Sequence, residues 1–266
     1  MTNALAEQSL PVPSALRAWI SSIDDIGVDR AGEAFTHLPD AATKVVVRVE
    51  EDGRHDTLVV GPRTRATYHA DPDKRLTSCV QLRLAPGAVG PLLGVPAVDL
   101  VGRAVPAGDL PAPTARRLAR ELTGARPREI TARLAGLLPP PTDGARERLL
   151  RAAVDALSTR ADRAPVTVRD VARELAISER QLRNLFTLGV GVSPKHYARI
   201  DRVRHLLTHA ASAPWAQLAA ATGYYDQAHM SADFRTLMGV PPTAFLTGRL
   251  PRATPCRARP GSAGRG

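Results

Sequence analysis

A repeat in the C-terminal third of the chain, at an offset of 48 residues, constrains the fold more than any other feature. A period of this size usually marks a supersecondary unit that is used more than once. Two copies are too few for a solenoid, so the repeat predicts a domain built from two similar units. The matching positions are Ala172 and Ala220, Ser178 and Asp226, Leu182 and Met230, Phe186 and Phe234, Gly191 and Gly239, Val192 and Val240, Pro194 and Pro242, and Tyr197 and Phe245.

The first copy predicts two short helices separated by a turn. Thr167 can cap a helix that runs to Ala176, and Ser178 can cap the second helix through its hydroxyl. Apolar residues at helical spacing then give each helix one inner face. In the second helix this face contains Leu182, Leu185 and Phe186.

The second copy predicts the same arrangement. Gly223 can end a short helix in the left-handed conformation, and Asp226 can cap the next one. We expect the second helix of each copy at about 178–188 and 226–238. A single basic helix over 194–210, of about four turns, joins the two copies. Each copy is therefore a predicted helix-turn-helix, a motif that reads DNA.

Two such units joined by a long helix resemble the AraC/XylS family of bacterial transcription regulators. The resemblance covers roughly residues 160–248. Ala176 stands where the family's first turn often has glycine, and Ala232 where a polar or arginine side chain is frequent. The family segment GF-x-D-x-S-x-F-x-R-x-F, followed by G-x-x-P, appears as Gly223, Tyr224, Asp226, Met230, Phe234, Gly239 and Pro242.

The front of the chain has a different pattern. Segments 43–53, 56–70 and 76–87 are rich in Val, Thr and Leu and are separated by turn residues, which predicts a small antiparallel sheet or barrel. Val45, Val47 and Val49 share one face of a strand, as Val80, Leu82 and Leu84 do of another. The family resemblance implies a cupin-like β-barrel here, for sensing an effector or for dimerisation.

The predicted fold class is therefore multidomain α+β. A small β domain (a cupin-like barrel) covers 1–110, and a helical connector covers 111–160 with a Pro-rich hinge near 139–144. The all-α double helix-turn-helix domain covers 161–248, and a Pro/Gly/Arg-rich tail over 249–266 is expected to be disordered. We expect the front domain to be separable and not to bind DNA.

The charge distribution is consistent with this division. The first 110 residues contain 11 Lys/Arg against 14 Asp/Glu, although the whole chain has a net charge of +10. A basic rear part favours contact with phosphates. The N-terminus lacks the pattern of a signal peptide and no apolar run reaches membrane-spanning length, so we expect a cytoplasmic protein that does not bind membranes.

The expected partners are double-stranded DNA and, from the family resemblance, a small-molecule effector of unknown identity, RNA polymerase if the protein is an activator, and a second copy in a homodimer. The outward side chains of the second helices offer donors and acceptors for base edges. The base-reading candidates are Arg180, Arg183, Asn184, Gln227, His229 and Ser231, and the phosphate-binding candidates are Ser178, Lys195, Arg199 and Arg235.

Two alternatives come from other classes. A DNA-repair or metal-dependent enzyme can carry the same DNA-binding module, and Pro255-Cys256-Arg257 faintly resembles the reactive site of alkyl-accepting repair proteins. His205 and His209 have the spacing of a zinc pair but lack a third ligand nearby. A nucleoid-type binder without an effector is the other alternative, and it would show no sequence preference. The sequence predicts no catalytic residue, metal site or cofactor.

Overall fold

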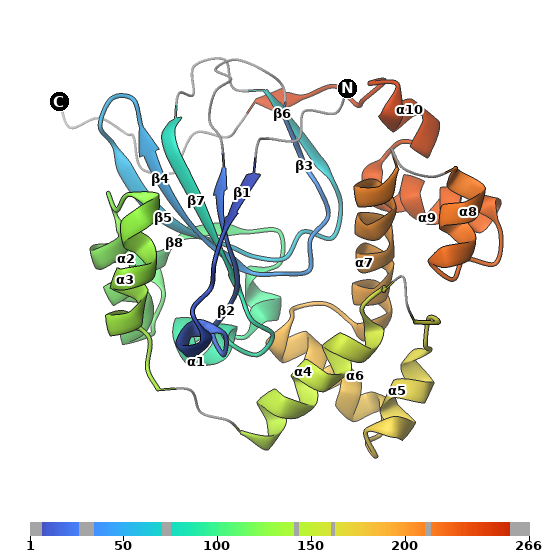
Figure 1. The fold of residues 1–266 in the computed structure, drawn as a ribbon, viewed down its shortest axis with the longest axis horizontal. Coiled ribbons are helices and arrows are strands. Elements are labelled where there is room, and N and C mark those ends of the chain that lie inside the picture. Colours follow the sequence, from blue (N-terminus) through green and yellow to red (C-terminus); the bar gives the residue numbers. More distant parts are fainter. Residues whose placement is uncertain are drawn as a thin grey trace.

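The computed structural model describes residues 7–26, 35–70, 76–140, 144–160, 163–210 and 214–255. The strands of the front half lie side by side, and the helices of the rear half gather beside and below them (Figure 1). This arrangement confirms the predicted α+β class, with a β-rich front and a helical rear. No helix in the described ranges is both long and apolar enough to cross a membrane.

The described strands form two sheets, which lie in the front half except for β9 from the C-terminal tail. One has six antiparallel strands in the order β1-β2-β7-β4-β5-β8, and the other has three in the order β3-β6-β9. The strands are β1 (Glu7–Leu10), β2 (Ile20–Ile26), β3 (Phe35–His37), β4 (Lys44–Glu50), β5 (His55–Val60), β6 (Thr67–Ala70), β7 (Leu76–Leu84), β8 (Ala104–Pro106) and β9 (Thr254–Pro255).

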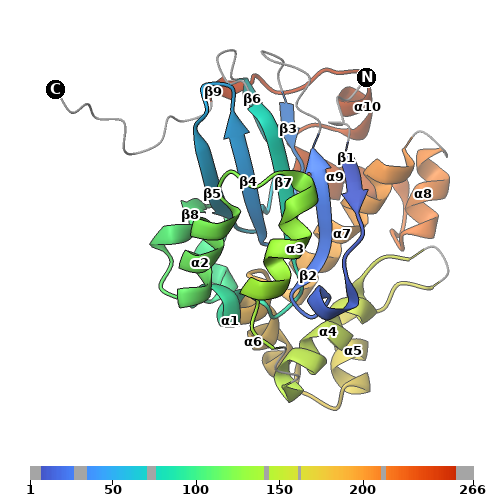
Figure 2. The ribbon, with the colours of Figure 1, turned by 60° about the vertical axis from the view of Figure 1, so that its left-hand side comes forward.

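The first core lies between the six-stranded sheet and a layer of short helices. Val45 pairs with Leu82 and Val47 with Val80, and all four side chains are buried, as the alternating pattern predicted. They pack against α1 (Val89–Leu93), α2 (Pro113–Leu122) and α3 (Pro127–Leu137). Figure 2 shows α2 and α3 in front of the sheet, and three short 3-10 helices complete this half: η1 (Ser14–Leu16), η2 (Ala97–Leu100) and η3 (Ala107–Asp109).

The second core holds the helical half together. Phe186 and Phe234 are fully buried in one cluster, with Ile200 and Val203 of the connecting helix between the two units. The helices are α4 (Ala145–Leu157), α5 (Val168–Glu174), α6 (Glu179–Gly189), α7 (Pro194–His209), α8 (Trp215–Ala221), α9 (Gln227–Met238) and α10 (Pro242–Leu246). The predicted second helices and the joining helix are thus confirmed as α6, α9 and α7.

The predicted connector divides between the two cores. Ile130 and Leu134 of α3 pack with the sheet, whereas Leu150 and Ala153 of α4 pack with the helix-turn-helix units. The indole of Trp19 donates a hydrogen bond to the carbonyl of Pro139 (2.9 Å), which ties the end of α3 to the front half. Residues 141–143 of the expected hinge lie outside the described residues, and the domain boundaries stay a prediction.

The tail differs from expectation over its first residues. Thr254 and Pro255 form β9, which pairs in parallel with His69 and Ala70 of β6. The Thr254 hydroxyl also donates to the carbonyl of Tyr68 (3.2 Å). Residues 256–266, which were also expected to be disordered, lie outside the described residues.

Both turns use the same backbone geometry. Ala176 has φ +52° and Gly223 has φ +75°, so each is left-handed and lies two residues beyond the end of its helix. The following N–H donates back across the turn in each unit, from Ile177 to Ala172 (3.0 Å) and from Tyr224 to Ala219 (3.1 Å). These matching bonds define which residues of the two units are equivalent.

This equivalence corrects one pair from the repeat. Ala172 corresponds to buried Ala219, and the predicted partner Ala220 is exposed. The reason is that the second turn has one more residue before its recognition helix, which places Tyr225 almost entirely in solvent (93% exposed). Equivalent residues of the two units are therefore 47 positions apart before the turn and 48 positions apart after it.

We expect Ala176→Gly to raise the free energy of unfolding by about 1 kcal/mol. A left-handed L-residue costs about 1–2 kcal/mol, and the freedom of glycine in the unfolded chain offsets part of that gain. Urea unfolding measures the difference. Ala220→Gly, in an exposed turn of α8, should instead destabilise by about 1 kcal/mol. If both substitutions lowered the free energy of unfolding equally, Ala176 would not be strained.

Candidate DNA-binding surface

The first recognition helix, α6, begins at a capping box. The Ser178 hydroxyl accepts from the Gln181 N–H (3.1 Å), and the Gln181 side chain accepts from the Ser178 N–H (2.8 Å). Leu182 and Phe186 anchor the opposite face in the core. This anchoring leaves Arg180, Arg183 and Asn184 exposed together on the outer face of α6, as predicted.

Among the described residues, the guanidinium groups of Arg180 and Arg183 form no ion pair, so Arg183 is not held by Glu179 one helical turn before it. Ser178, in contrast, already uses its hydroxyl for the cap. Its place at the start of α6 still leaves it exposed, beside the orphan N–H groups of the first helical turn.

The second recognition helix, α9, presents a less basic surface. Asp226 caps it by accepting from the His229 N–H (2.7 Å). Gln227 and His229 are exposed, and Ser231 is half-buried. Ala228 and Ala232 lie between them on the exposed side. The structure therefore brings the predicted readers of α9 together at its first two turns, with few charged groups among them.

The connecting helix α7 holds the two units apart. Its 16 residues correspond to a length of about 24 Å. Lys195, at its first turn, is exposed, and so is Arg235 near the end of α9. These two phosphate candidates are accessible to an external ligand.

Arg199, another phosphate candidate, is placed differently. Its guanidinium binds the buried carboxylate of Asp233 on α9, with Nε and Nη2 at 3.0 and 2.7 Å from Oδ1. Arg202 lies 3.9 Å from Oδ2 of the same carboxylate and stacks over the Tyr224 ring. Only 25% of the Arg199 side chain is exposed. Arg199 thus ties α7 to α9 inside the protein.

Sequence reasoning missed this tie although the sequence contains a signal for it. Asp233 lies three residues after Met230 and next to Phe234, so it falls on the inner side of α9. An acidic residue on an inner face needs a cationic partner, because an unpaired buried charge is costly. The basic helix α7 was the obvious source of that partner.

The front half contacts the C-terminal ends of both recognition helices. The Gly87 N–H donates to the carbonyl of Gly189, the last residue of α6 (3.3 Å). The Ala66 N–H donates to the carbonyl of Leu237 (2.7 Å), and the Tyr68 hydroxyl donates to that of Met238 (2.5 Å). The last carbonyls of a helix have no partner within it. Loops and strands of the front half therefore complete both helix ends.

The histidine pair does not form a metal centre in the described part of the chain. His205 and His209 stack with ring centroids 4.2 Å apart, and Nδ1 of His209 lies 2.8 Å from the carbonyl oxygen of His205. No group of three metal-ligating side chains occurs among the residues that the structure describes. Cys256, which suggested a repair enzyme, lies outside those residues.

Residues 171–248 match a family model described as a helix-turn-helix domain. This span begins within α5 and ends after α10, so it contains both recognition helices and the joining helix. This segment is a DNA-binding domain of the AraC/XylS type. No curated protein sequence matches this chain significantly.

The solved structures that are similar to this chain are distant from it in sequence. An AraC-type transcriptional regulator from Chromobacterium violaceum is 28% identical, with 38% of this chain and 92% of that one covered and a TM-score of 0.32. The C-terminal domain of AraT from Geobacillus stearothermophilus is 22% identical (41% and 92% covered, TM-score 0.35). ToxT from Vibrio cholerae is 9% identical (85% and 96% covered, TM-score 0.43).

We expect Tyr68→Phe to lower the free energy of unfolding by about 1 kcal/mol, because the Met238 carbonyl loses its hydrogen-bond donor. If α9 reads a DNA segment of its own, affinity for a fragment that contains only that segment should fall in parallel. Urea unfolding and DNA titration check the two effects. Tyr225→Phe is the matched control for stability, since Tyr225 is 93% exposed. Indistinguishable stabilities of the two variants would contradict a role for the Tyr68 hydroxyl.

Proposed function

We propose that this regulator binds two consecutive major-groove segments on one face of double-stranded DNA, one with α6 and one with α9. The support is the pair of capped helices with exposed outer faces, joined by one continuous helix. A recognition helix places its N-terminal residues in the major groove, and successive segments on one face lie about 34 Å or 10 bp apart. The burial of both units in one core keeps their separation fixed.

We also propose that sequence preference depends mainly on α6. Arg180, Arg183 and Asn184 are exposed side chains whose donors suit guanine and adenine edges. Gln227, His229 and Ser231 give α9 weaker readout because Ala228 and Ala232 separate them. Lys195 and Arg235 would bind phosphates, and Ser178 would do so at the start of α6. Arg199 would reach a phosphate only by leaving Asp233.

The front half is proposed to sense a small-molecule effector and to support a homodimer. The support is its position, since it contacts both recognition helices at their C-terminal ends. Contact with RNA polymerase, if the protein is an activator, and action in the cytoplasm complete the proposal. The same contacts make the expected separation of the halves less favourable. A fragment without the front half would lose the hydrogen bonds that Gly87, Ala66 and Tyr68 donate to the ends of α6 and α9.

Footprinting of the bound operator tests the two-groove arrangement. We expect two protected major-groove segments per protomer, about 10 bp apart on one face. A chain that anchors through one unit would protect a single segment, and that result would exclude the proposal. Inserting about 5 bp between the segments should abolish simultaneous contact, because it rotates them to opposite faces.

We expect Arg183→Ala to weaken binding by about 1–3 kcal/mol and to relax base preference at one position of the site. Competition binding against a set of single-base operator variants measures both effects. Lys195→Ala should weaken all variants alike and reduce the salt dependence of binding. Arg54→Ala, on an exposed hairpin of the front half, is a control that should bind as the unaltered chain does. If Arg183→Ala bound the operator variants with the same relative affinities as the unaltered chain does, Arg183 would not be a base reader.

A further inference from the structure

The link between β5 and β6 contacts both the first turn of α7 and the end of α9. A hydrogen bond joins the backbone of Thr64 to the ring of His196, the third residue of α7. Two residues further on, the Ala66 N–H donates to the carbonyl of Leu237, near the end of α9 (2.7 Å). These two contacts hold the backbone of Arg65 beside both helices of the DNA-binding half.

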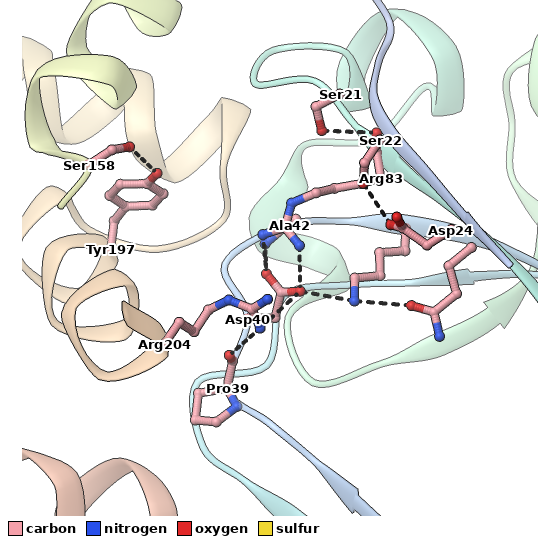
Figure 3. Close-up of polar contacts among 12 residues, drawn as sticks. Ser21, Ser22, Asp24, Pro39, Asp40, Ala42, Arg83, Ser158, Tyr197 and Arg204 are labelled. Carbon is pink, nitrogen blue, oxygen red and sulfur yellow. Dashed lines mark hydrogen bonds and ion pairs between the residues drawn. The ribbon is translucent and has the colours of Figure 1, made fainter. Parts of the chain in front are cut away.

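The side chain of Arg65 is exposed and has no partner of its own. Among the described residues, its guanidinium forms no hydrogen bond or ion pair. Arg83 and Arg204, elsewhere at this junction, are instead paired with Asp40 (Figure 3). Arg65 therefore combines an anchored backbone with a guanidinium that is available to an external ligand.

A second arginine lies close to this guanidinium. Arg65 and Arg235 of α9 both line a cleft of about 470 Å³ between β6, the end of α9 and the tail. Arg235 is exposed and forms no ion pair with any described residue. Of the described residues that line the cleft, none is acidic. A water molecule takes up about 30 Å³ in the liquid, so the cleft has room for a phosphate group and several waters.

The carboxylate on the inner side of α9 is already engaged. Asp233 acts on His196, which also feels the charge of Arg65. The carboxylate binds Arg199 at 2.7 Å and lies 3.9 Å from Arg202. Its charge is thus matched before that of Arg65 is counted. The cleft therefore keeps two arginines without a partner.

The end of α9 offers less resistance to an anion than most helix ends do. The last carbonyls of a helix carry a partial negative charge, which repels anions. Here the front half supplies donors to two of them, from the Ala66 N–H to Leu237 and from the Tyr68 hydroxyl to Met238. The segment that carries Arg65 thus also reduces the negative charge beside it.

Arg235 lies on the side of α9 that faces DNA in the proposed arrangement. It follows Ala228 and Ala232 at helical spacing, and all three side chains are exposed. A recognition helix contacts base edges through its N-terminal residues, so its last turn lies at the rim of the groove, where the phosphates are. A cation beside Arg235 is therefore placed to meet the backbone of the groove that α9 enters.

We propose that Arg65 and Arg235 together bind one phosphate of the DNA backbone at that rim. Two guanidinium groups can hold a phosphate through several charge-assisted hydrogen bonds. Arg65 is then a DNA contact from the front half, against the expectation that this half takes no part in DNA binding. The proposal rests on the two-groove function above. It adds that the placement of the front half beside α9 contributes directly to affinity.

Titration of the operator with the full chain, over a range of salt concentrations, tests the contact. Arg65→Gln should weaken binding about tenfold at low salt, equivalent to one lost charged contact. The loss should be the same for all single-base variants of the operator, because a phosphate carries no sequence information. The slope of log affinity against log salt should become less steep by up to about one. Arg65→Lys retains the charge and should recover most of that slope.

Arg128→Gln is the matched control for net charge. Arg128 is exposed on α3 and forms no ion pair with any described residue. The strands of the sheet separate α3 from α9 (Figure 1). This variant loses the same charge as Arg65→Gln and should leave affinity and slope nearly unchanged. Equal effects of the two substitutions would show that only net charge matters, and the proposal would be wrong.

Uncharged methylphosphonates, placed one at a time in the operator, locate the contact. We expect one position beside the segment read by α9 where the neutral group weakens the unaltered chain most. Arg65→Gln and Arg235→Gln should each lose less at that position, and the double variant nothing, because the partners of that phosphate are already gone. If Arg65→Gln and the unaltered chain lost equally at every position, Arg65 would bind no phosphate.

Urea unfolding tests whether Arg65 has a structural role instead. Since its guanidinium contacts no described residue, Arg65→Gln should unfold at the same urea concentration as the unaltered chain. A lower midpoint would make Arg65 a structural partner, against the proposal.

The remaining outcomes separate this contact from the proposed function. If Arg65→Gln kept its DNA affinity while Arg183→Ala lost affinity, the two-groove function would stand and the contact would be refuted. Saturable binding of inorganic phosphate that Arg65→Gln loses, with DNA affinity unchanged, would assign the cleft to a small anion and also refute it. A full chain that binds no DNA would refute both.

Discussion

The burial of Phe186 and Phe234 in one continuous core is the constraint on which the DNA-binding half depends. Each ring anchors one recognition helix, and Ile200 and Val203 of α7 lie in the same cluster. Fully burying a large apolar side chain stabilises the fold by about 1.5–3 kcal/mol. The outer faces of α6 and α9 can therefore carry unpaired polar groups without loss of the fold. Their separation is set by packing, and it does not depend on contact with DNA.

The junction with the front half is of another physical kind. It combines backbone and hydroxyl donors at the ends of α6 and α9 with ion pairs from Lys44, Arg83 and Arg204 to Asp40, and the buried Ala41 packs with the second core. Hydrogen bonds exchange with water at a net gain of only about 0.5–1.5 kcal/mol each. Such a junction can rearrange at lower cost than the apolar cores on either side of it. A signal that passes from the front half to α7 would therefore act here.

The repeat and the capping residues predicted most of the helical half. Ser178, Asp226 and Gly223 act locally, so their roles could be predicted from neighbouring residues alone. The alternating valines of β4 predicted its buried face for the same reason. The strands β1 and β2 were not predicted, because β2 is rich in Ser and Asp and its register shifts between Ile20 and Ser22. Pairing with β7, which is distant in sequence, makes this segment a strand.

The residues that sequence reasoning missed share one property: their partners are distant in the chain. Tyr68 binds a carbonyl 170 positions away, and Arg204 contacts Pro39 across 165 positions. No local pattern encodes these two contacts. Arg199 shows the consequence, since its type and its place on a basic helix predicted a phosphate contact, whereas Asp233 holds it within the protein. A cation near a DNA-binding surface is available to phosphate only if no buried carboxylate has engaged it first.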